Sequence, residues 1–486
     1  MRMLHPVLFA LFLVAGALYE VRPLGSLPEA AACAPVLILI AFGLFALFRF
    51  ALKKNDDKAA LLTTVVMAYL GLTGEFSLAI ANVFRDKGWP LLDNVYWGLL
   101  VLTGLLILLA AVIWRAKTSL ASVNHAVLTM VSALLLMAVG GFWTDRREEA
   151  WRVFLKPTPV RLEMPERPHD IYYIILDSYT SVDNLREFWG YDSAELRTFL
   201  SENGFQLAPG ARSEYNYTTF SLASRLNMKN PPPVFCDWEN RYTRNVLYRF
   251  IEQSSVPKLL EAAGYKVVNL SMFPLGKQAA RYPVSSFLCF NSVLKMIRER
   301  SVVCAIFASV PKKRARALRL PGSRLQPFLD LEAVAGESCD QPRFIYAHVL
   351  LPHEPMVFNR DGSLHKARSK GKATKEDYLD QLIFTTRLFC RTVSRIMKQY
   401  PQPPVIIVQG DHGYRFLKES AEACEKESYG MLNAMLLPGL DIGQELRALP
   451  PQNTFRLVFN QLFNAGLPYV TNSVSLRPVE GAGTDE

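Results

Sequence analysis

The stretch Pro-Val-Ile-Ile-Val-Gln-Gly-Asp-His-Gly, residues 404–413, joins a run of apolar residues to an acid and an imidazole. Such a short apolar run is typical of a strand in a parallel sheet, because helices cover both faces of that sheet. Ligands bind beyond the carboxyl ends of these strands, where Asp411 and His412 lie. The stretch therefore predicts an α/β fold with chemistry in the loop after this strand, although an Asp-His pair also occurs in turns that cap a helix.

The chain after residue 165 alternates short apolar segments with helical patterns. This alternation predicts an α/β domain with a doubly wound, mostly parallel sheet. We expect this domain at residues 169–470, after a charged linker at 145–168 and before a flexible tail at 471–486. The expected strands are residues 171–176, 266–270, 344–350, 405–408 and 432–437, and the clearest expected helices are residues 194–203, 256–263 and 378–399.

The first 144 residues hold most of the apolar excess of a chain that has 486 residues and is 50% hydrophobic. Residues 6–19 have the length of a signal-peptide core, but no small-residue cleavage site follows, so we predict an uncleaved span. Later apolar segments reach the ~20 residues that a spanning helix needs. The sequence predicts an all-α transmembrane domain with five spans at residues 1–144. The later segments are residues 30–50, 61–84, 95–114 and 120–143.

Basic residues between the spans predict the orientation, because they favour the cytoplasmic side of a membrane. With a cytoplasmic N-terminus, the inner segments hold more basic residues than the outer loops, and everything after the fifth span lies outside the cytoplasm. Glu75 in the third span is costly in lipid, so we expect it to face other helices or to lie near an interface. The inner residues are Arg2, Arg49, Lys53, Lys54, Lys58, Arg115 and Lys117, and the outer ones are Arg22, Arg85 and Lys87.

Most cysteines lie in the outer part, where an oxidising compartment favours disulfides. Their even number suggests disulfide bonds, but the sequence does not choose among the pairings. These cysteines are Cys236, Cys289, Cys304, Cys339, Cys390 and Cys424.

Asp177 directly follows the expected strand at residues 171–176. If this strand lies beside the one that precedes Asp411 and His412, all three side chains emerge at the same sheet edge. Two carboxylates and an imidazole converging there are costly unless a cation joins them. Their oxygen and nitrogen atoms suit one divalent metal, with zinc or manganese as the leading choices. The alternative is that Asp177 only caps the helix that follows.

Two histidines lie at the end of the expected strand at residues 344–350 and in the turn after it. His353 stands between Pro352 and Pro355, and we expect it to bind substrate or to donate a proton. His348 could equally be a buried histidine with satisfied hydrogen bonds.

Thr218 begins a polar stretch that leads into an apolar helical pattern. Its hydroxyl is expected at a helix N-terminus, where free amides and the helix dipole favour an anion. A metal-bound threonine alkoxide at this position could attack a phosphate. The alternative is an ordinary N-cap, which Ser and Thr often fill.

Basic residues cluster in a long insertion and again at residues 365–375. Both stretches could attract anionic lipid headgroups, although such runs are more often solvated loops. Neither has the interleaved aromatic residues of a single-strand binding surface, so no nucleic-acid partner is predicted. The insertion holds Arg298, Arg300, Lys312, Lys313, Arg314, Arg316, Arg319 and Arg324.

Four motifs occur in a fixed order along the outer part. They are Ile174-Ile175-Leu176-Asp177, Thr218-x-x-Ser221-Leu222-Ala223-Ser224, His348-x-x-x-x-His353-x-Pro355 and Gly410-Asp411-His412-Gly413. Together they resemble the sulfatase-like branch of the alkaline phosphatase superfamily. Five spans followed by such a domain are similar to lipoteichoic acid synthases and lipid A phosphoethanolamine transferases. The resemblance implies a bacterial inner-membrane protein with a periplasmic or extracellular catalytic domain.

The resemblance also implies roles for single residues. In those families a threonine in the register of Thr218 is the covalent nucleophile, and matching positions imply that it holds the metal together with Asp177, Asp411 and His412. Ser178 stands where many sulfatases have a second carboxylate, so one metal is expected rather than two.

Three further positions match substrate contacts of the resembled families. His348 and His353 recur at matching spacing and would hold substrate or a second zinc, and Asn433 would also contact substrate. Formylglycine sulfatases resemble Cys/Ser-x-Pro-x-Arg at the nucleophile, and a threonine cannot give that aldehyde.

The leading functional hypothesis is a membrane-anchored, metal-dependent phosphotransferase. It would move a phospho-substituent from a phospholipid donor to an envelope glycan or lipid through a threonine-linked intermediate. One alternative is a sulfatase-like hydrolase at the same site, acting as a phosphodiesterase, phosphatase or sulfuric ester hydrolase. The other is an inactive envelope scaffold.

Overall fold

The computed structural model describes residues 2–21, 27–87, 89, 94–144, 147–237, 240–282, 293–307, 321–365, 374–417 and 419–470. The chain divides into two units. The first comprises Met1–Arg146 with Cys289–Lys312, and the second comprises Arg147–Leu288 with Lys313–Glu486. A segment from far along the chain thus belongs with the N-terminal helices, which the sequence pattern does not indicate. The expected tail lies outside the described residues.

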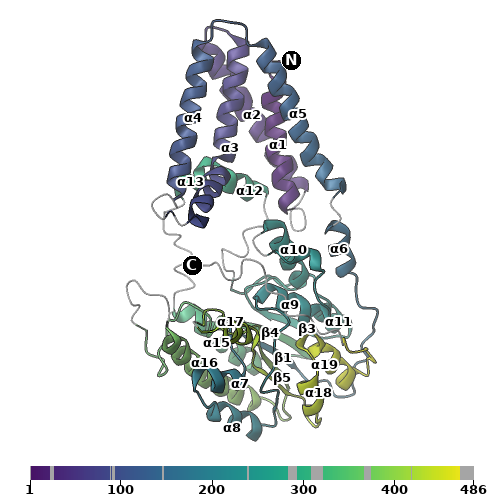
Figure 1. Cartoon of the computed structure of the whole chain (residues 1–486). Coiled ribbons are helices and arrows are strands. Elements are labelled where there is room, and N and C mark those ends of the chain that lie inside the picture. Colours follow the sequence, from purple (N-terminus) through teal and green to yellow (C-terminus); the bar gives the residue numbers. More distant parts are fainter. Residues whose placement is uncertain are drawn as a thin grey trace. The chain divides into compact units, whose positions relative to one another are not determined.

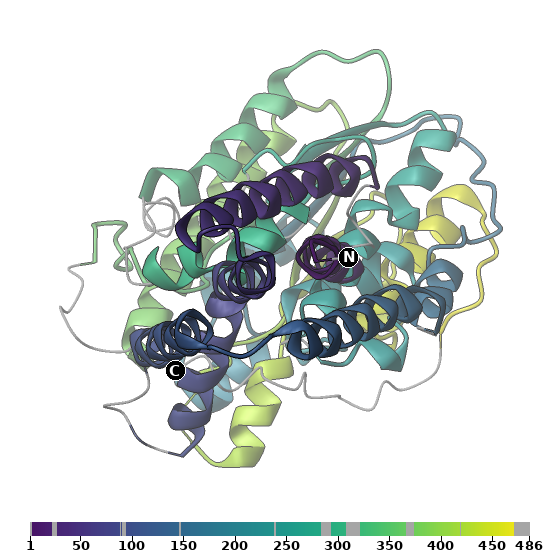
Figure 2. The same cartoon turned by 90° about the horizontal axis from the view of Figure 1, so that it is seen from above.

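Five long apolar helices make up most of the first unit (Figure 1), and Figure 2 looks nearly along several of them. They are α1 (Leu4–Val21), α2 (Leu27–Ala51), α3 (Asp56–Asp86), α4 (Val95–Arg115) and α5 (Ala121–Thr144). Each is long and apolar enough to cross a membrane by length and composition, which confirms the five expected spans. The apolar windows of α2 and α4 are only 6% buried, an exposure that suits lipid better than water.

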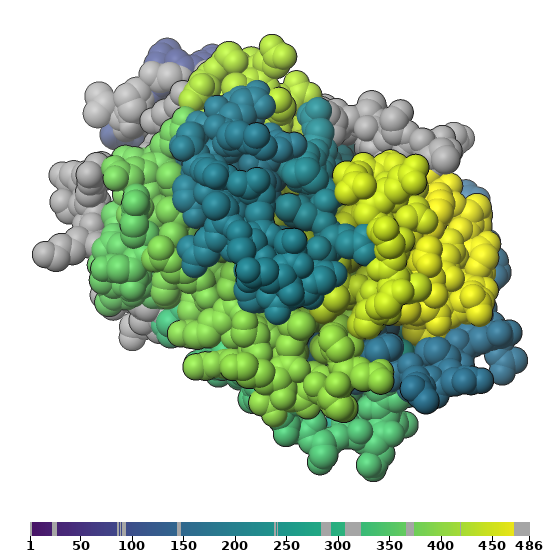
Figure 3. All heavy atoms as spheres, turned by 90° about the horizontal axis from the view of Figure 1, so that it is seen from below, coloured from purple at the N-terminus to yellow at the C-terminus, as the bar shows by residue number. Residues whose placement is uncertain are grey.

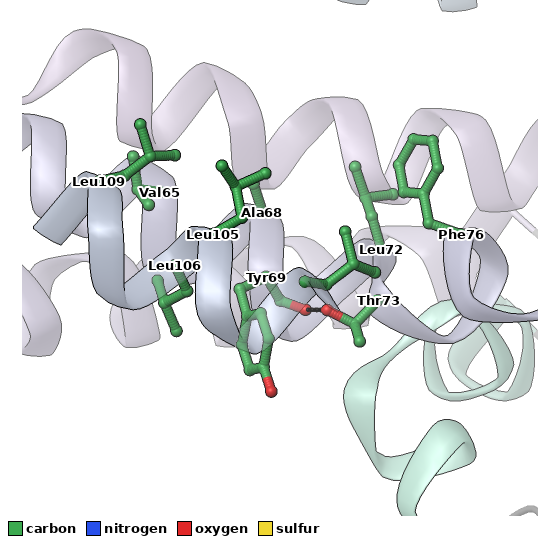
Figure 4. A pocket seen from close by; sticks show the side chains of 10 residues that line it. Val65, Ala68, Tyr69, Leu72, Thr73, Phe76, Leu105, Leu106 and Leu109 are labelled. Carbon is green, nitrogen blue, oxygen red and sulfur yellow. Dashed lines mark hydrogen bonds between the residues drawn. The ribbon is translucent and has the colours of Figure 1, made fainter. Parts of the chain in front are cut away.

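An apolar groove of about 210 Å³ lies along α3 and α4 (Figure 4). The polar side chains that line it, Tyr69 and Thr73, have partners in α3 or α4. The Tyr69 and Thr103 hydroxyls lie 2.8 Å apart, and the Thr73 hydroxyl donates to the Tyr69 carbonyl. A surface with apolar side chains and satisfied polar atoms is what contact with lipid requires.

Six strands form the sheet of the second unit, in the order β2-β6-β5-β1-β4-β3. They are β1 (Ile171–Leu176), β2 (Gln206–Leu207), β3 (Lys266–Leu270), β4 (Arg343–Val349), β5 (Val405–Gly410) and β6 (Asn433–Leu436). Neighbours among β5, β1, β4 and β3 are parallel, whereas β6 is antiparallel to both β5 and β2. The expected mostly parallel α/β sheet is confirmed. Strand β2 was not predicted, because two residues are too few to show a pattern.

The centre of the sheet brings two strand ends into register. Every residue of β1, β4 and β5 is buried, as expected for continuous apolar strands. Leu176 at the end of β1 pairs with Val349 of β4 on one side and with Gly410 of β5 on the other. Asp177 and Asp411, the next residues along their strands, therefore leave the sheet side by side.

Helices connect the strands and pack around the sheet. The helices expected at residues 194–203, 256–263 and 378–399 are α8 (Ala194–Glu202), α11 (Ser255–Ala262) and α16 (Lys375–Met397). Helix α6 (Arg147–Phe154) lies within the expected linker. Figure 3 shows one face of the second unit, where the segment near residue 200 meets the C-terminal segment. The helices are α6 (Arg147–Phe154), α7 (Val182–Trp189), α8 (Ala194–Glu202), α9 (Thr218–Asn227), η1 (Pro233–Phe235), α10 (Arg241–Glu252), α11 (Ser255–Ala262), α15 (Pro321–Gly336), α16 (Lys375–Met397), α17 (Ala421–Tyr429), α18 (Gly443–Ala448), η2 (Pro451–Asn453) and α19 (Thr454–Phe463).

The expectation of disulfides is wrong for the cysteines that the structure describes. Cys236, Cys304, Cys339, Cys390 and Cys424 are all free thiols, as is Cys33 in α2. Even number and compartment are compositional arguments, and they do not bring two sulfur atoms together. Cys289 lies outside the described residues.

Candidate metal centre

Three side chains meet at the carboxyl edge of the sheet. Asp177 follows β1, while Asp411 and His412 follow β5, and all three are buried. One ligand atom from each residue lies within 4.8 Å of the other two. The structure thus brings together the two carboxylates and the imidazole that sequence spacing placed at one edge.

Neither acid caps a helix, which removes the simpler explanations of both motifs. Helix α7 begins after Ser181, whose side chain accepts from the Asn184 amide, so Asp177 is not its cap. Helix α17 begins after Ser420, far from Asp411 in sequence.

The two oxygens of Asp411 have different surroundings. Its Oδ1 accepts hydrogen bonds from the backbone amides of Ser178 at 2.8 Å and of His412 at 2.9 Å. Its Oδ2 is buried, has no hydrogen-bond partner and lies 3.3 Å from Nε2 of His412. Ser178 has a φ of 61°, a left-handed conformation that is costly for a residue with a side chain and that recurs at active sites. The backbone therefore fixes one carboxylate oxygen and leaves the other available to a ligand.

The hydrogen bonds of His412 identify its free nitrogen. Nδ1 lies 2.7 Å from the carbonyl oxygen of Gly413, and a carbonyl only accepts, so Nδ1 carries the proton. Nε2 therefore presents its lone pair in the neutral ring. Burial lowers the pKa of His412, opposed by Asp411 and assisted by the Arg415 guanidinium, which favours this neutral form.

Asp177 is held ionised by the histidines around it. Burial alone would raise the pKa of this carboxyl, but the imidazoles of His353, His348 and His412 together hold it well below its usual range. His348 Nε2 lies 3.1 Å from Asp177 Oδ2. The Asp177 carboxylate therefore stays negatively charged at the sheet edge.

These residues fit a divalent metal ion. They offer two carboxylates and a neutral imidazole, which are the donors such ions bind. The buried, unpartnered Oδ2 of Asp411 is the strongest sign, because a buried carboxylate oxygen without a partner is costly.

Thr218 is the first residue of α9, and its hydroxyl lies 3.4 Å from Nε2 of His412. The N-cap of this helix is Tyr217, which makes no side-chain capping bond. Thr218 therefore does not serve as an ordinary N-cap. It is half-buried and projects a hydroxyl toward the acid–imidazole cluster.

His348 lies in the protein interior, whereas His353 is partly exposed at the surface. His348 is buried in β4 and stacks on Phe273, with ring centroids 5.8 Å apart, while its Nδ1 has no hydrogen-bond partner. His353 is half-buried in the following loop. Its Nδ1 donates to the Glu354 carbonyl at 2.7 Å, so Nε2 is the nitrogen that remains for substrate.

Arg225, to which sequence reasoning assigned no role, supports the loop of Asp411. This arginine of α9 is fully buried and donates to the Gly410 carbonyl at 2.7 Å and to the Asp411 carbonyl at 3.0 Å. It also donates to the Ser213 hydroxyl at 2.8 Å and lies 3.5 Å from a Glu214 oxygen. A charged residue inside an apolar helical pattern was the available signal, because buried cations need partners.

Arg324 is not part of a solvated basic surface, and its assignment to one is corrected. It is 2% exposed, and its guanidinium donates to the carbonyls of Leu350, His353 and Glu354. Gln381 of α16 also donates to the His353 carbonyl, at 3.0 Å. Both side chains hold the backbone of the loop that presents the His353 imidazole.

Arg415 is a second residue that the motifs did not reveal. It is half-buried, and its guanidinium lies 4.7 Å from the ring centre of Tyr217 and 5.6 Å from that of Phe416. Among the described residues no carboxylate pairs with it. This cation therefore lies against the residue that precedes the expected nucleophile, and its charge acts on His412.

The loop after His412 packs closely against α17. A Cβ atom on Gly413 would come within 1.9 Å of the Glu427 carbonyl and 2.6 Å of the Gly430 carbonyl, so only glycine fits. The Glu427 side chain is buried and accepts from Thr180 Oγ1 and Trp189 Nε1, both at 2.9 Å. Burial raises the pKa of Glu427 to about 7.

Asn433 lies inside the sheet, away from water. Its side-chain oxygen accepts from Gln409 at 2.9 Å, and Gln409 also donates to Thr454 at 2.8 Å. The Tyr173 hydroxyl donates to the oxygen of Gln409 in turn. A contact between Asn433 and substrate stays a prediction.

No family model matches the chain, and no curated protein is similar at a significant level. The lipooligosaccharide phosphoethanolamine transferase EptA from Neisseria meningitidis is 13% identical, with 95% of this chain and 94% of that chain covered and a TM-score of 0.41. The periplasmic domain of EptC from Escherichia coli is 14% identical, with coverage of 68% and 92% and a TM-score of 0.40. The lipoteichoic acid synthase LtaP from Listeria monocytogenes is 11% identical, with coverage of 60% and 70% and a TM-score of 0.33.

Proposed function

We propose that this chain is a membrane-anchored, metal-dependent phosphotransferase that moves a phospho-substituent from a lipid donor to an envelope glycan or lipid. The position of Thr218 carries this proposal. Its hydroxyl stands at the start of α9, 3.4 Å from His412 Nε2, at the edge of a buried cluster of two acids and an imidazole.

One divalent ion, zinc or manganese, would be held by Asp177, Asp411, His412 and Thr218. When bound, such an ion lowers the pKa of a ligated hydroxyl and neutralises phosphoryl charge. Asp411 Oδ2 and His412 Nε2 support this assignment. The other polar atom of each side chain, Oδ1 of Asp411 and Nδ1 of His412, is already hydrogen-bonded to the backbone.

The reaction would take place in two steps, with Thr218 as nucleophile. Its oxygen, after losing a proton to solvent, would form a bond to phosphorus while the ester bond to the donor alcohol breaks. His353, as the imidazolium, would give its Nε2 proton to that departing oxygen. The acceptor hydroxyl would then return a proton to His353 and attack phosphorus, and the bond to Thr218 would break.

The N-terminus of α9 and Arg415 would stabilise the anionic substrate. Helix N-termini present free amides and a positive dipole end to a phosphate. Arg415 adds a full positive charge beside Tyr217, the residue before Thr218. These groups act on the charge that spreads over phosphoryl oxygens in the transition state.

The membrane segments support a lipid substrate. Five helices have the length and composition of membrane spans. The distribution of basic residues between the spans favours a cytoplasmic N-terminus, which would put the α/β unit outside the cytoplasm. A membrane enzyme in this position has phospholipid as its nearest source of phosphoryl groups and the envelope as its acceptor.

The test compares the wild-type chain with Thr218→Ala and Thr218→Ser, using labelled phospholipid and envelope extract. Thr218→Ala is expected to lower turnover about 10³-fold or more, because it removes the nucleophile, while Thr218→Ser retains part of the activity. Mass spectrometry of the wild-type chain should find the phospho-substituent on Thr218. Turnover by the purified Thr218→Ala variant at the wild-type rate would refute the assignment.

The products separate transfer from its alternatives. A labelled glycan or lipid supports transfer, and free headgroup alone supports a hydrolase at the same site. Metal content tests the scaffold alternative, since the unpartnered buried Oδ2 of Asp411 favours a metal ion. A full chain that retains no stoichiometric zinc or manganese, and shows no turnover, would support the scaffold.

A further inference from the structure

Two short helices from the middle of the chain belong to the first unit. They are α12 (Val293–Arg300) and α13 (Val302–Phe307), and the segments before and after them along the chain belong to the second unit. Helix α12 contacts α1, α2 and α3, and α13 contacts α3 and α4. Figure 1 shows both at one end of the long helices.

The start of α12 is held by α2. The Glu29 carboxylate accepts hydrogen bonds from the backbone amides of Val293 at 3.1 Å and Leu294 at 3.3 Å. An acid at a helix N-terminus satisfies free amides and interacts well with the helix dipole. Val293 and Met296 are buried in one apolar cluster with Val14, Ala17, Val21 and Ala30.

The end of α12 is held by two acids of the long helices. Arg300 has a side chain that is 13% exposed, and its guanidinium pairs with Glu20 of α1. Its Nε lies 3.1 Å from an oxygen of Glu75 in α3. Glu75, costly within an apolar span, thus faces a cation supplied from outside the N-terminal region. Arg300 is therefore not part of a solvated basic loop, although its position in the sequence suggests one.

Gly74 provides the space that this contact needs. A Cβ atom at this position would lie 2.5 Å from the Ser301 carbonyl oxygen, 2.7 Å from that of Glu299 and 3.0 Å from that of Arg300. Any larger residue would force the end of α12 away from α3.

The exposed residues of the two helices are mainly apolar, and Arg298, one turn after Leu294, is the exposed charge among them. Leu294 is 62% exposed, Val303 is 45% exposed and Ile306 is 48% exposed. In water such a surface would be unfavourable, whereas amphipathic helices bury it at a membrane surface. The surface is continuous with α4, a helix whose apolar window is itself 6% buried, because the Tyr96 hydroxyl at the start of α4 donates to the Ile306 carbonyl.

We propose that α12 and α13 lie in the interface of the membrane that α1–α5 cross, with Leu294, Val303 and Ile306 in contact with lipid. The charged contacts through Glu29 and Arg300 hold the pair against the long helices. The insertion is thereby a second, interfacial attachment of the α/β unit to the membrane, independent of the covalent link after α5.

Three native cysteines permit a direct test in the full-length protein. Cys304 of α13 is exposed, as are Cys236 and Cys339 of the second unit, which serve as references. The protein in nanodiscs of phosphatidylethanolamine and phosphatidylglycerol is treated with a sulfonated maleimide or with N-ethylmaleimide, and each thiol is quantified by mass spectrometry. The ratio of charged to uncharged labelling at Cys304 is expected to be at least tenfold below that at the reference thiols.

Equal ratios at all three thiols would show that the face lies in water and would overturn the proposal. Protection of Cys304 from both reagents would overturn it too, since a protein surface such as a second copy would then cover the face. Arg300→Ala should raise the Cys304 ratio at least threefold, whereas Arg298→Ala, an exposed arginine of the same helix, should leave it unchanged. An unchanged ratio in Arg300→Ala would refute the role given to the ion pairs.

Discussion

The floor and the rim of the candidate site are built differently. The floor, defined as Asp177, Asp411 and His412, is fully buried and follows directly from two strand ends. The rim, defined as Thr218, His353 and Arg415, is half-buried and comes from a helix start and two loops. The floor is held by backbone donors and buried charges, so changes there should affect metal, stability and turnover together. At the rim, a change at Arg415 should affect substrate binding alone, whereas Thr218 and His353 also take part in the proposed reaction.

The largest effect is expected from Asp411→Asn. An asparagine keeps an oxygen in the place of Oδ1, which accepts from Ser178 and His412, but it replaces the unpartnered Oδ2 with an amide that cannot bind a metal. Metal content measured by mass spectrometry should fall to background, and turnover should fall about 10³-fold or more. Asp340→Asn, at an exposed acid, is the control. Retained metal in Asp411→Asn would separate this carboxylate from the metal site.

Arg225→Met tests how the floor is supported. The change removes donors to the Gly410 and Asp411 carbonyls and leaves Glu214 buried without its cation. Losing one partner of a buried pair costs about 3–5 kcal/mol, which should appear as a lower midpoint of thermal unfolding of the α/β unit.

A double variant sharpens this prediction. Adding Glu214→Leu to Arg225→Met should recover part of the loss, because no charge then stays buried alone. If the double variant is no more stable than the single one, the lost carbonyl contacts account for the whole effect.

The floor was largely predictable from sequence, and the reason is geometric. Asp177 and Asp411 follow short apolar strands, and parallel neighbours end at one edge whatever the details of packing. The same holds for the position of Thr218, because a polar residue before an apolar helical pattern indicates a helix start.

The supporting arginines could not be assigned from sequence. Arg225 donates to the carbonyls of Gly410 and Asp411, which are 185 and 186 residues further along the chain. Arg324 donates to the carbonyl of His353 in the loop after β4. Backbone carbonyls are present at every residue and carry no sequence signal. Arg324 and Arg300 looked like members of one basic stretch, yet the first is buried behind His353 and the second pairs with acids of the long helices.

The position of α12 and α13 could not be predicted from sequence for a different reason. Val293 and Met296 are apolar residues at helical spacing, and the sequence does not say which unit's core they enter. The answer depends on partners such as Glu29 and Gly74, which lie far away in sequence and have no motif.

Glu427→Gln should change the pH dependence of stability. Burial raises the pKa of Glu427 from 4.5 to about 7, so between these values the folded chain keeps a proton that the unfolded chain has lost. Its contribution to the free energy of unfolding therefore falls as pH rises through this window, by about 3 kcal/mol in total. Gln cannot titrate, so the thermal midpoint of the variant should fall less than that of the wild type between about pH 5 and about pH 7, a range that lies inside this window. Glu425→Gln, an exposed acid of α17, should follow the wild type.

The smallest effect is expected at the rim, from Arg415→Gln. The guanidinium stands beside Tyr217 without a carboxylate partner among the described residues, so it is available to an anionic oxygen of the substrate. Removing one such contact should raise KM about tenfold, and inorganic phosphate should inhibit about tenfold more weakly. Metal content and the thermal midpoint should stay close to wild-type values, because Arg415 makes no hydrogen bond to the floor, and burial, the largest cause, still lowers the pKa of His412.

Arg387→Gln, an exposed arginine that pairs with Glu195 on the protein surface, is the matched control for loss of charge. If both arginine variants raise KM equally, the effect comes from the general field of the protein and Arg415 does not contact substrate. If Arg415→Gln also loses metal, then floor and rim are one unit, and the distinction between them fails. A change in KM confined to Arg415 would instead show that substrate affinity can be altered without disturbing the residues that hold the ion.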